Sequence, residues 1–174
     1  MRSAMNGSGP GVLRGVLALL LAGLLAACDL QNISELEEGV STEADVRERF
    51  GAPEAVWEGE DGAQIYEYNR QPAGHTNYMI TIGPDGKMAA LRQVLNARTF
   101  AQVQAGMPME AVRRMLGKPM KITTYSLKRE THYDWRYLEG ASADTSMIFT
   151  VVFDTDLKVV STMSTRDPDL DPGR

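Results

Sequence analysis

The chain has 174 residues, 43% of them apolar, and a formal net charge of −5 at pH 7. This size suits one compact domain or two small ones. An acidic chain is a poor ligand for nucleic acid or for an anionic lipid surface, so neither is expected as the main partner. The single cysteine, Cys28, excludes an internal disulfide, because a disulfide needs a second thiol.

The first 27 residues have the layout of a bacterial secretion signal. Arg2 and Arg14 precede an apolar run from Val16 to Ala27, and the segment holds no acidic residue. This run is shorter than the roughly 20 apolar residues that span a bilayer. Leu25-Ala26-Ala27-Cys28 then resembles the lipobox of bacterial lipoproteins, in which the signal is cut before a cysteine whose sulfur receives a diacylglyceryl group.

We therefore expect residues 1–27 to be a lipoprotein signal peptide and residues 28–32 to form the lipid anchor and a short tether. Cys28 is the predicted lipid attachment residue, carrying acyl chains such as palmitate. The alternative is a chance cysteine in an uncleaved leader or membrane anchor. After cleavage, 16 basic and 23 acidic side chains remain, so the membrane attachment is expected to be covalent and not electrostatic.

One pattern of apolar residues, glycines and prolines occurs twice in the remaining chain. Four positions of the first copy recur at an offset of 67 residues: Ile33, Leu36, Gly39 and Val40 match Phe100, Val103, Gly106 and Met107. Four more recur at an offset of 66: Val46, Phe50, Gly51 and Pro53 match Val112, Leu116, Gly117 and Pro119. We expect two tandem modules, 33–98 and 99–165, followed by a disordered tail, 166–174, that is rich in Pro, Gly and charge.

Each copy predicts helices first and strands afterwards. Ile33 and Leu36 lie on one face of a short first helix. Thr42 with Asp45 has the form of a capping box, so Thr42, or Ser41 beside it, can start a second helix. Period-two alternation then predicts strands at 66–68, 78–82 and 88–95, and again at 133–137, 147–153 and 157–163. The expected fold class is α+β, with two tandem modules that are each a helix pair followed by an antiparallel β-meander. The helices should cover one face of each sheet and leave the other partly open.

The second copy also resembles a known family. Gly106, Met107, Val112, Leu116, Gly117 and Pro119 fill the signature of the SmpA/OmlA (BamE-like) family of outer-membrane assembly lipoproteins, with Pro108 replacing its usual Thr. The first copy matches more loosely, being one residue longer between Gly39 and Val46. The tandem arrangement is similar to the β-lactamase inhibitor protein fold. The matching positions are caps, turns and core positions, so the resemblance describes folding better than binding.

Five aromatic residues are the candidate partner-binding residues: Tyr66, Tyr68, Tyr133, Trp135 and Tyr137. They alternate along two strands, with Ile65 and Glu67 on the opposite face of the first. They can belong to the core beneath the helices, or part of the set can anchor a partner on an exposed sheet face, and core is the more frequent use of such positions. The arginines of the second helices, such as Arg113 and Arg114, are expected on solvated faces.

Few residues in the sequence suggest a catalytic or metal site. His75 and His132 are the only histidines and lie in different modules, which is a poor basis for a metal site. Asp134 lies two residues from His132, but no nucleophile stands beside them in the sequence. The sequence contains no phosphate-binding glycine loop and no hydrolase motif. We expect a protein that is not an enzyme and has no metal, cofactor or small-molecule substrate.

The family resemblance implies a lipoprotein that faces the periplasm and acts as a scaffold in outer-membrane β-barrel assembly or envelope integrity. Its partners would be the membrane, through the N-terminal lipid, and envelope proteins such as the β-barrel assembly machinery. The competing interpretation is an inhibitor or sensor module that binds a periplasmic enzyme through a sheet face. The expected location is the outer membrane, although Asp29, directly after the lipid-bearing cysteine, is an inner-membrane retention signal in enteric bacteria.

Overall fold

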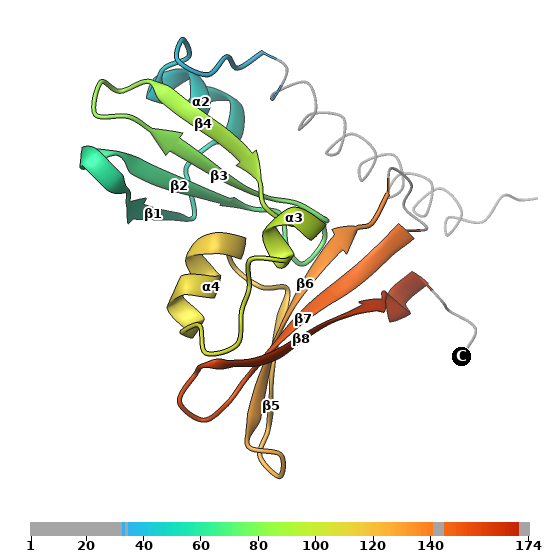
Figure 1. Ribbon diagram of the computed structural model, residues 1–174. Helices are drawn as coiled ribbons and strands as arrows, with labels where there is room; N and C mark the ends of the chain where they lie inside the picture. The colour runs from blue at the N-terminus through green and yellow to red at the C-terminus, as the bar shows by residue number, and fades with distance from the viewer. Residues whose placement is uncertain (1–32, 34, 141–144, 171–174) are drawn as a thin grey trace, which may run out of the picture.

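The computed structural model describes residues 33, 35–140 and 145–170 (Figure 1). The predicted signal peptide, Cys28 and Asp29 lie outside this part of the chain. Two four-stranded antiparallel sheets, ordered β1-β2-β3-β4 and β5-β6-β7-β8, form the two modules. The predicted α+β class and the two antiparallel modules are thereby confirmed. Within the described residues, the helices are too short or too polar to cross a bilayer.

The first module consists of α2 Glu43–Phe50, β1 Ala55–Glu58, the 3-10 turn η1 Glu60–Gly62, β2 Gln64–Asn69, β3 Asn77–Ile82 and β4 Met88–Gln93. The second consists of α3 Ala97–Phe100, α4 Met109–Leu116, β5 Lys121–Tyr125, β6 Glu130–Leu138, β7 Ser146–Phe153, β8 Val159–Arg166 and the 3-10 turn η3 Pro168–Leu170. Strands β1 and β5 were not predicted from the sequence. Both are short edge strands.

The predicted capping box starts α2. Asp45 N–H donates to Thr42 Oγ1 at 3.3 Å, and Thr42 N–H donates to the Asp45 carboxylate at 2.7 Å. Val46 and Phe50 are buried on the inner face of the helix, as their spacing of four residues predicts. Gly51 ends the helix with φ = +80°, a conformation that glycine adopts without strain.

The predicted pair of helices in each module is not confirmed. In the second module α3 has only four residues and precedes the longer α4. In the first module α2 is the helix whose bounds are described. The expected earlier helix around Ile33 and Leu36 lies at the edge of the described chain, where Ile33 is helical and Glu35 already belongs to a turn.

Equivalent backbone hydrogen bonds join the helix start to the last turn of the meander in both modules. In the first, N–H groups of Gly39, Glu43 and Met88 donate to carbonyls of Met88, Gly86 and Ser41. In the second, those of Gly106, Met109 and Val159 donate to carbonyls of Val159, Leu157 and Met107. All six bonds measure 2.8 to 2.9 Å, so the repeat in the sequence is also a repeat in structure.

This pattern corrects one matched pair of the sequence comparison. Met107 occupies the place of Ser41, which is buried, and not that of Val40, which is exposed. The one-residue slip between the copies therefore comes directly after Gly39. The first module inserts Val40 into the turn before its helix.

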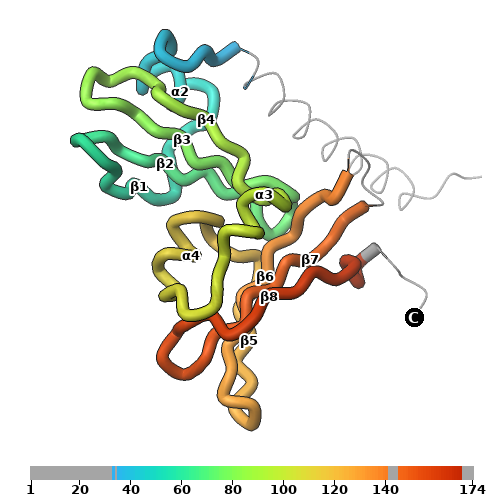
Figure 2. Tube along the Cα trace, in the orientation of Figure 1, coloured from blue at the N-terminus to red at the C-terminus, as the bar shows by residue number. Residues whose placement is uncertain are grey.

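The helix α4 lies between the two sheets (Figures 1 and 2). One face of the first sheet, including Tyr66 and Ile80, packs on Val46 and Phe50 of α2. The opposite face contributes Met79 and Ile65 to the core of the second module. The second module covers part of this far face, while Trp57, Ile65 and Thr81 stay half-buried on it beside a second hollow, so the face is partly open as expected.

The end of the second module also departs from expectation. Arg166 is the last residue of β8, and Asp167 is buried and forms an ion pair with Arg136 at 2.6 Å. The prediction of a disordered tail from Arg166 is thus wrong for residues 166–170, because a buried ion pair and η3 fix them against the sheet. Residues 171–174 lie outside the described chain.

Candidate functional site

All five candidate aromatic residues are buried, with exposed fractions of 9% or less: Tyr66, Tyr68, Tyr133, Trp135 and Tyr137. They occupy the strand faces that the helices cover. Their role as exposed partner anchors is therefore corrected in favour of the core alternative.

The polar groups of these rings are used inside the protein. Trp135 Nε1 donates to the carbonyl of Gly117 at 3.0 Å, and Tyr68 Oη donates to that of Gly51 at 3.1 Å. Each bond satisfies a carbonyl just past a helix end, where no intrahelical donor is available. Burial also raises the pKa of the Tyr68 phenol to about 12. These side chains fix the ends of α2 and α4 to the sheets beneath them.

Glu67 is the functional residue that the sequence interpretation missed. Its side chain is fully buried although it points away from Tyr66 and Tyr68. One carboxylate oxygen accepts from Lys118 N–H at 2.6 Å and lies 3.3 Å from an Arg113 guanidinium nitrogen. The other oxygen accepts from Trp57 Nε1 at 3.2 Å. A buried charge is tolerated when paired and hydrogen-bonded in this way, and here its partners come from both modules.

Asn77 completes this polar interface between the modules. Its side-chain amide donates to the carbonyls of Leu116 at 2.8 Å and Lys118 at 3.2 Å, so it caps the last turn of α4. Gly117 lies between them, and a Cβ atom there would come within 2.9 Å of Asn77 Nδ2 and 3.2 Å of Glu67 Oε1. The glycine that the sequence predicts as a helix end is therefore also required for close approach of the modules.

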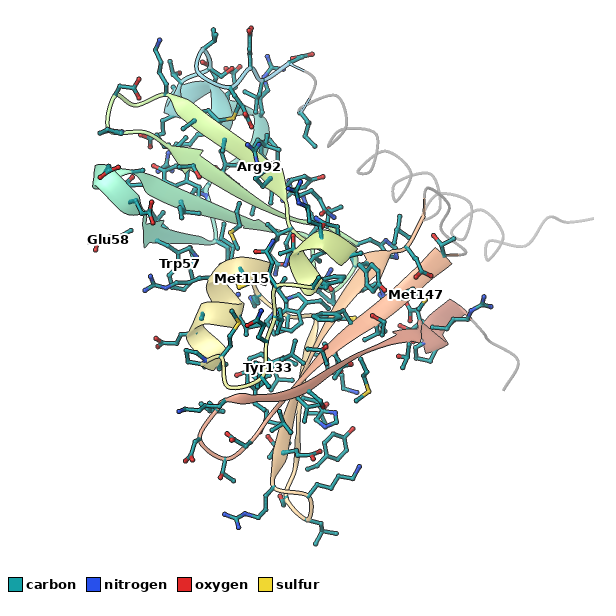
Figure 3. The ribbon with its side chains drawn as sticks, in the orientation of Figure 1. Trp57, Glu58, Arg92, Met115, Tyr133 and Met147 are labelled. Carbon is teal, nitrogen blue, oxygen red and sulfur yellow. The ribbon has the colours of Figure 1, made fainter. Side chains whose placement is uncertain are left out.

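The arginines of α4 turn toward the first module and not to solvent alone. Arg113 reaches Glu67, and the Arg114 guanidinium lies 5.3 Å from the centre of the Trp57 ring, within cation–π range. Figure 3 shows Trp57 on the first-module side of α4 and Tyr133 on the side of the second sheet. The expectation of a solvated face is wrong for Arg113, which is half-buried against Glu67, whereas Arg114 is exposed as expected while its guanidinium also contacts Trp57.

A hollow of about 640 Å³ opens beside this interface. Met109, Met120 and Tyr133 contribute its apolar lining. Arg113, Lys118 and Lys121 contribute cationic groups, and Glu54 contributes one carboxylate, which pairs with Lys118. Adaptable methionines beside an aromatic ring and cations are typical of surfaces that bind proteins. We take this inter-module groove as the candidate functional site.

His75, Ser146 and Asp167 are brought together at the far end of the second sheet, which the sequence did not indicate. His75 Nε2 lies 3.0 Å from Ser146 Oγ, and the hydroxyl donates to Asp167 at 2.8 Å. The serine is the middle member and is fully buried, whereas a nucleophilic triad places the histidine between serine and carboxylate. Because the Ser146 hydroxyl donates its proton to Asp167, the His75 ring N–H donates to Ser146 Oγ. This cluster therefore links the β2–β3 loop to β7 and the end of β8, and it is not arranged for nucleophilic attack.

Electrostatics agree with this structural role. Burial lowers the pKa of His75 and the Arg136 guanidinium lowers it further, while Asp167 opposes both. Burial by itself would raise the pKa of Asp167, but hydrogen bonds from Ser146 and from Asp169 N–H, together with Arg136, bring it below its usual range. The histidine is thus held neutral beside an ionised carboxylate.

The second histidine has different neighbours. His132 Nε2 lies 3.2 Å from Glu130, and Asp134 accepts a hydrogen bond from Thr150 at 2.6 Å. In the part of the chain that the structure describes, His, Cys, Asp and Glu form no group of three that could hold a metal ion.

Neither a protein-family model nor a curated protein matches the sequence. Two solved structures are similar to parts of it. A DUF4309 family protein (YjgB) from Bacillus subtilis subsp. subtilis str. 168 is 19% identical, with 76% of this chain and 83% of that chain covered and a TM-score of 0.28. A proposed β-lactamase inhibitor protein from Streptococcus mutans is 10% identical, with 79% and 94% covered and a TM-score of 0.31. At these scores neither likeness decides a family, an activity or a partner.

Proposed function

We propose that the protein is a lipid-anchored, non-enzymatic lipoprotein of the bacterial envelope, facing the periplasm from the outer membrane. It acts as a scaffold in outer-membrane β-barrel assembly or envelope integrity by binding other envelope proteins. The lipobox ending at Cys28 and the SmpA/OmlA-like pattern from Gly106 to Pro119 support this proposal. The inter-module interface around Glu67 is the structural observation that carries it.

A scaffold must hold its binding surfaces in a fixed orientation relative to one another. The interface around Glu67 fixes the orientation of the two modules. Separating the modules would part the Glu67 carboxylate from Arg113 and Lys118 N–H, and would break the bonds from the Asn77 amide to the carbonyls of Leu116 and Lys118. Met79 and Ile65 of the first sheet also pack in the core of the second module, and separating the modules would expose this shared apolar surface to water, so the two modules move as one body. The groove beside the interface keeps its shape for the same reason.

Crosslinking from the groove tests the scaffold role. A photoreactive amino acid replaces Ile122, which lines the groove and is 54% exposed, in the full-length protein in living cells. The expected adducts contain components of the β-barrel assembly machinery after detergent extraction. The control position is Glu48, which is exposed on α2 away from the groove. Absence of that machinery from the adducts, with unchanged β-barrel levels and detergent resistance in a deletion strain, would rule the role out.

The second candidate function is an inhibitor or sensor module that binds a periplasmic enzyme through a sheet face. The face of the second sheet opposite Trp135 favours it, since the described helices pack on the other side. Tyr125 and Met163 share that face by strand register and are 43% and 44% exposed. A photoreactive residue at position 163 would then capture a soluble periplasmic enzyme whose activity changes when the purified protein is added.

A further inference from the structure

The β5–β6 hairpin, Lys121–Glu130 with its turn, carries an unusual exposed tip. It projects away from α4 and the first module (Figure 1). Leu127, at the turn, has an exposed fraction of 103%, and Tyr125 and Ile122 on β5 are also exposed. One exposed apolar residue is ordinary. Ile122 lies on the sheet face opposite Tyr125 by strand register, so the apolar part of the tip is Leu127 with Tyr125.

The backbone holds this tip in place. Lys128 N–H donates to the Tyr125 carbonyl at 3.1 Å, and Arg129 N–H donates to that of Ser126 at 3.3 Å. Arg129 has φ = +57°, the left-handed conformation that is unfavourable for every residue except glycine. Arg129 thus holds a conformation in which glycine would be unstrained, and strain of this kind concentrates at functional positions.

The hairpin is a positive region on an acidic protein. Between residues 121 and 130 there are three cations, Lys121, Lys128 and Arg129, and one acid, Glu130, whereas the chain as a whole has a net charge of −5. Glu130 is already engaged by His132. Lys121 also lines the inter-module groove, at the end of the hairpin away from its turn.

We propose that this hairpin docks on an acidic protein surface, with Leu127 entering an apolar pocket and Lys128 and Arg129 pairing with carboxylates around it. This inference rests on the protein-binding role proposed above and adds the chemistry of the partner. Charge complementarity selects an acidic surface, and the preformed turn limits the entropy lost on binding.

A lipid surface is the less suitable occupant. A single leucine gives weak membrane affinity, and the acidic body of the protein repels an anionic bilayer. The hairpin also projects from the second module on the side away from the first module, which holds the N-terminal part of the described chain (Figure 1).

The test begins with a photoreactive amino acid at Ser126, beside Leu127, in the full-length protein in cells. The captured partner is identified, and its affinity for the purified full chain in detergent micelles is measured at low and high salt. Leu127→Ser and the double change Lys128→Glu with Arg129→Glu should each weaken binding about tenfold or more, and added salt should weaken the wild-type complex.

Two matched variants control for charge and apolar surface elsewhere. Lys87→Glu with Arg98→Glu makes the same charge change at other exposed positions, and Val160→Ser removes an exposed apolar side chain from β8. Both controls should bind as the wild type does. Equal weakening by the control and hairpin variants, or no weakening by the hairpin variants, overturns the proposal.

Two further outcomes separate this inference from the proposed function. Adducts with the assembly machinery from position 122, together with none from position 126, would refute the hairpin inference and leave the scaffold role standing. Failure at both positions would reject both. Flotation of the Cys28→Ser protein with phosphatidylethanolamine–phosphatidylglycerol vesicles, lost on Leu127→Ser, would show a lipid surface and overturn the protein partner.

Discussion

Leu157 occupies a backbone conformation that suits glycine. It has φ = +56° in the turn between β7 and β8, and the equivalent turn of the first module has Gly86 at φ = +76°. The two turns use the same bonds: Gly86 N–H donates to Gly83 at 2.9 Å, and Leu157 N–H donates to Asp154 at 3.1 Å. A residue with a Cβ atom is less stable in this conformation by roughly 1–2 kcal/mol.

Leu157→Gly should therefore raise the free energy of unfolding by about 1 kcal/mol, because it removes this strain at an exposed position. Urea denaturation of the full chain in detergent measures the change. Leu157→Ala is the matched control, since it removes the leucine side chain but retains Cβ. A gain in the alanine variant equal to that in the glycine variant would contradict the explanation.

Glu67→Ala should lower the free energy of unfolding by about 3–5 kcal/mol. The loss leaves Arg113, Lys118 N–H and Trp57 Nε1 without their shared acceptor inside the protein. Glu58→Ala, on the neighbouring strand and exposed, should change it by less than about 0.5 kcal/mol. Similar losses in the two variants, measured by the same denaturation, would show that Glu67 does not hold the interface.

Little in the sequence marks Glu67 as special. Glutamate is disfavoured in strands, so a glutamate between two tyrosines of a predicted strand could have indicated a special role for Glu67. The alternation correctly placed Glu67 on the strand face opposite Tyr66 and Tyr68. A charged side chain on that face is ordinarily expected to be exposed to solvent. Its burial depends on Lys118, 51 residues further along the chain, and no local pattern reports a contact over that distance.

At the scale of elements, the β2–β3 loop, residues 70–76, joins the first module to β6. Arg136 N–H donates to Gln71 Oε1 at 3.0 Å, and Gln71 Nε2 donates to the Arg136 carbonyl at 2.9 Å. The register between β5 and β6 ends at Asp134, so this side-chain amide takes the place of a neighbouring strand. His75, in the same loop, bonds to Ser146 on β7.

The lowered pKa of His75 makes this loop sensitive to acid. A histidine that binds its proton less readily when folded favours the unfolded chain as pH falls below its ordinary value of about 6.5. Stability from this residue is therefore complete above that pH and declines as pH falls toward the folded-state pKa. His75→Gln keeps a donor for Ser146 and should flatten the decline between about pH 7 and 5. Unfolding free energies of both proteins across this range check the prediction, and parallel curves would refute it.

The sequence located six of the eight strands but not β1 and β5. The six carry alternating large apolar or aromatic residues, which is the signal that period-two analysis detects. Strand β5, Lys121–Tyr125, is largely exposed on both faces and lacks that alternation. Strand β1 has only four residues. Strand β1 forms by backbone pairing with β2, and β5 forms by backbone pairing with β6. Backbone pairing does not require a particular pattern of side chains, so the sequence does not reveal these strands.

At the scale of the whole molecule, the lipid anchor is a direct prediction from the sequence. Cys28→Ser should abolish incorporation of labelled palmitate and release the protein from the membrane fraction, since one thiol carries the attachment. Asp29→Ser is the matched variant, because it should keep the label. Palmitate labelling of the serine variant at position 28 would contradict the lipobox interpretation.

The same Asp29→Ser variant tests sorting between membranes. If Asp29 acts as a retention signal in the native host, the wild type sediments with the inner membrane on a density gradient and the variant moves to the outer membrane. The outer-membrane location proposed above predicts that both sediment with the outer membrane.

The sequence by itself determined the duplication, because the two copies repeat residue by residue at an offset of 66 or 67. It also determined the α2 cap at Thr42 and the antiparallel strands with the strongest alternation, because these depend on residues within a few positions of one another. The tertiary structure decided which faces of the sheets and helices are buried and against what. It buried all five aromatic residues, covered part of the far face of the first sheet with the second module, and fixed residues 166–170 against the second sheet. These outcomes depend on contacts between modules and between chain segments far apart, and local periodicity carries no information about which surface will meet which.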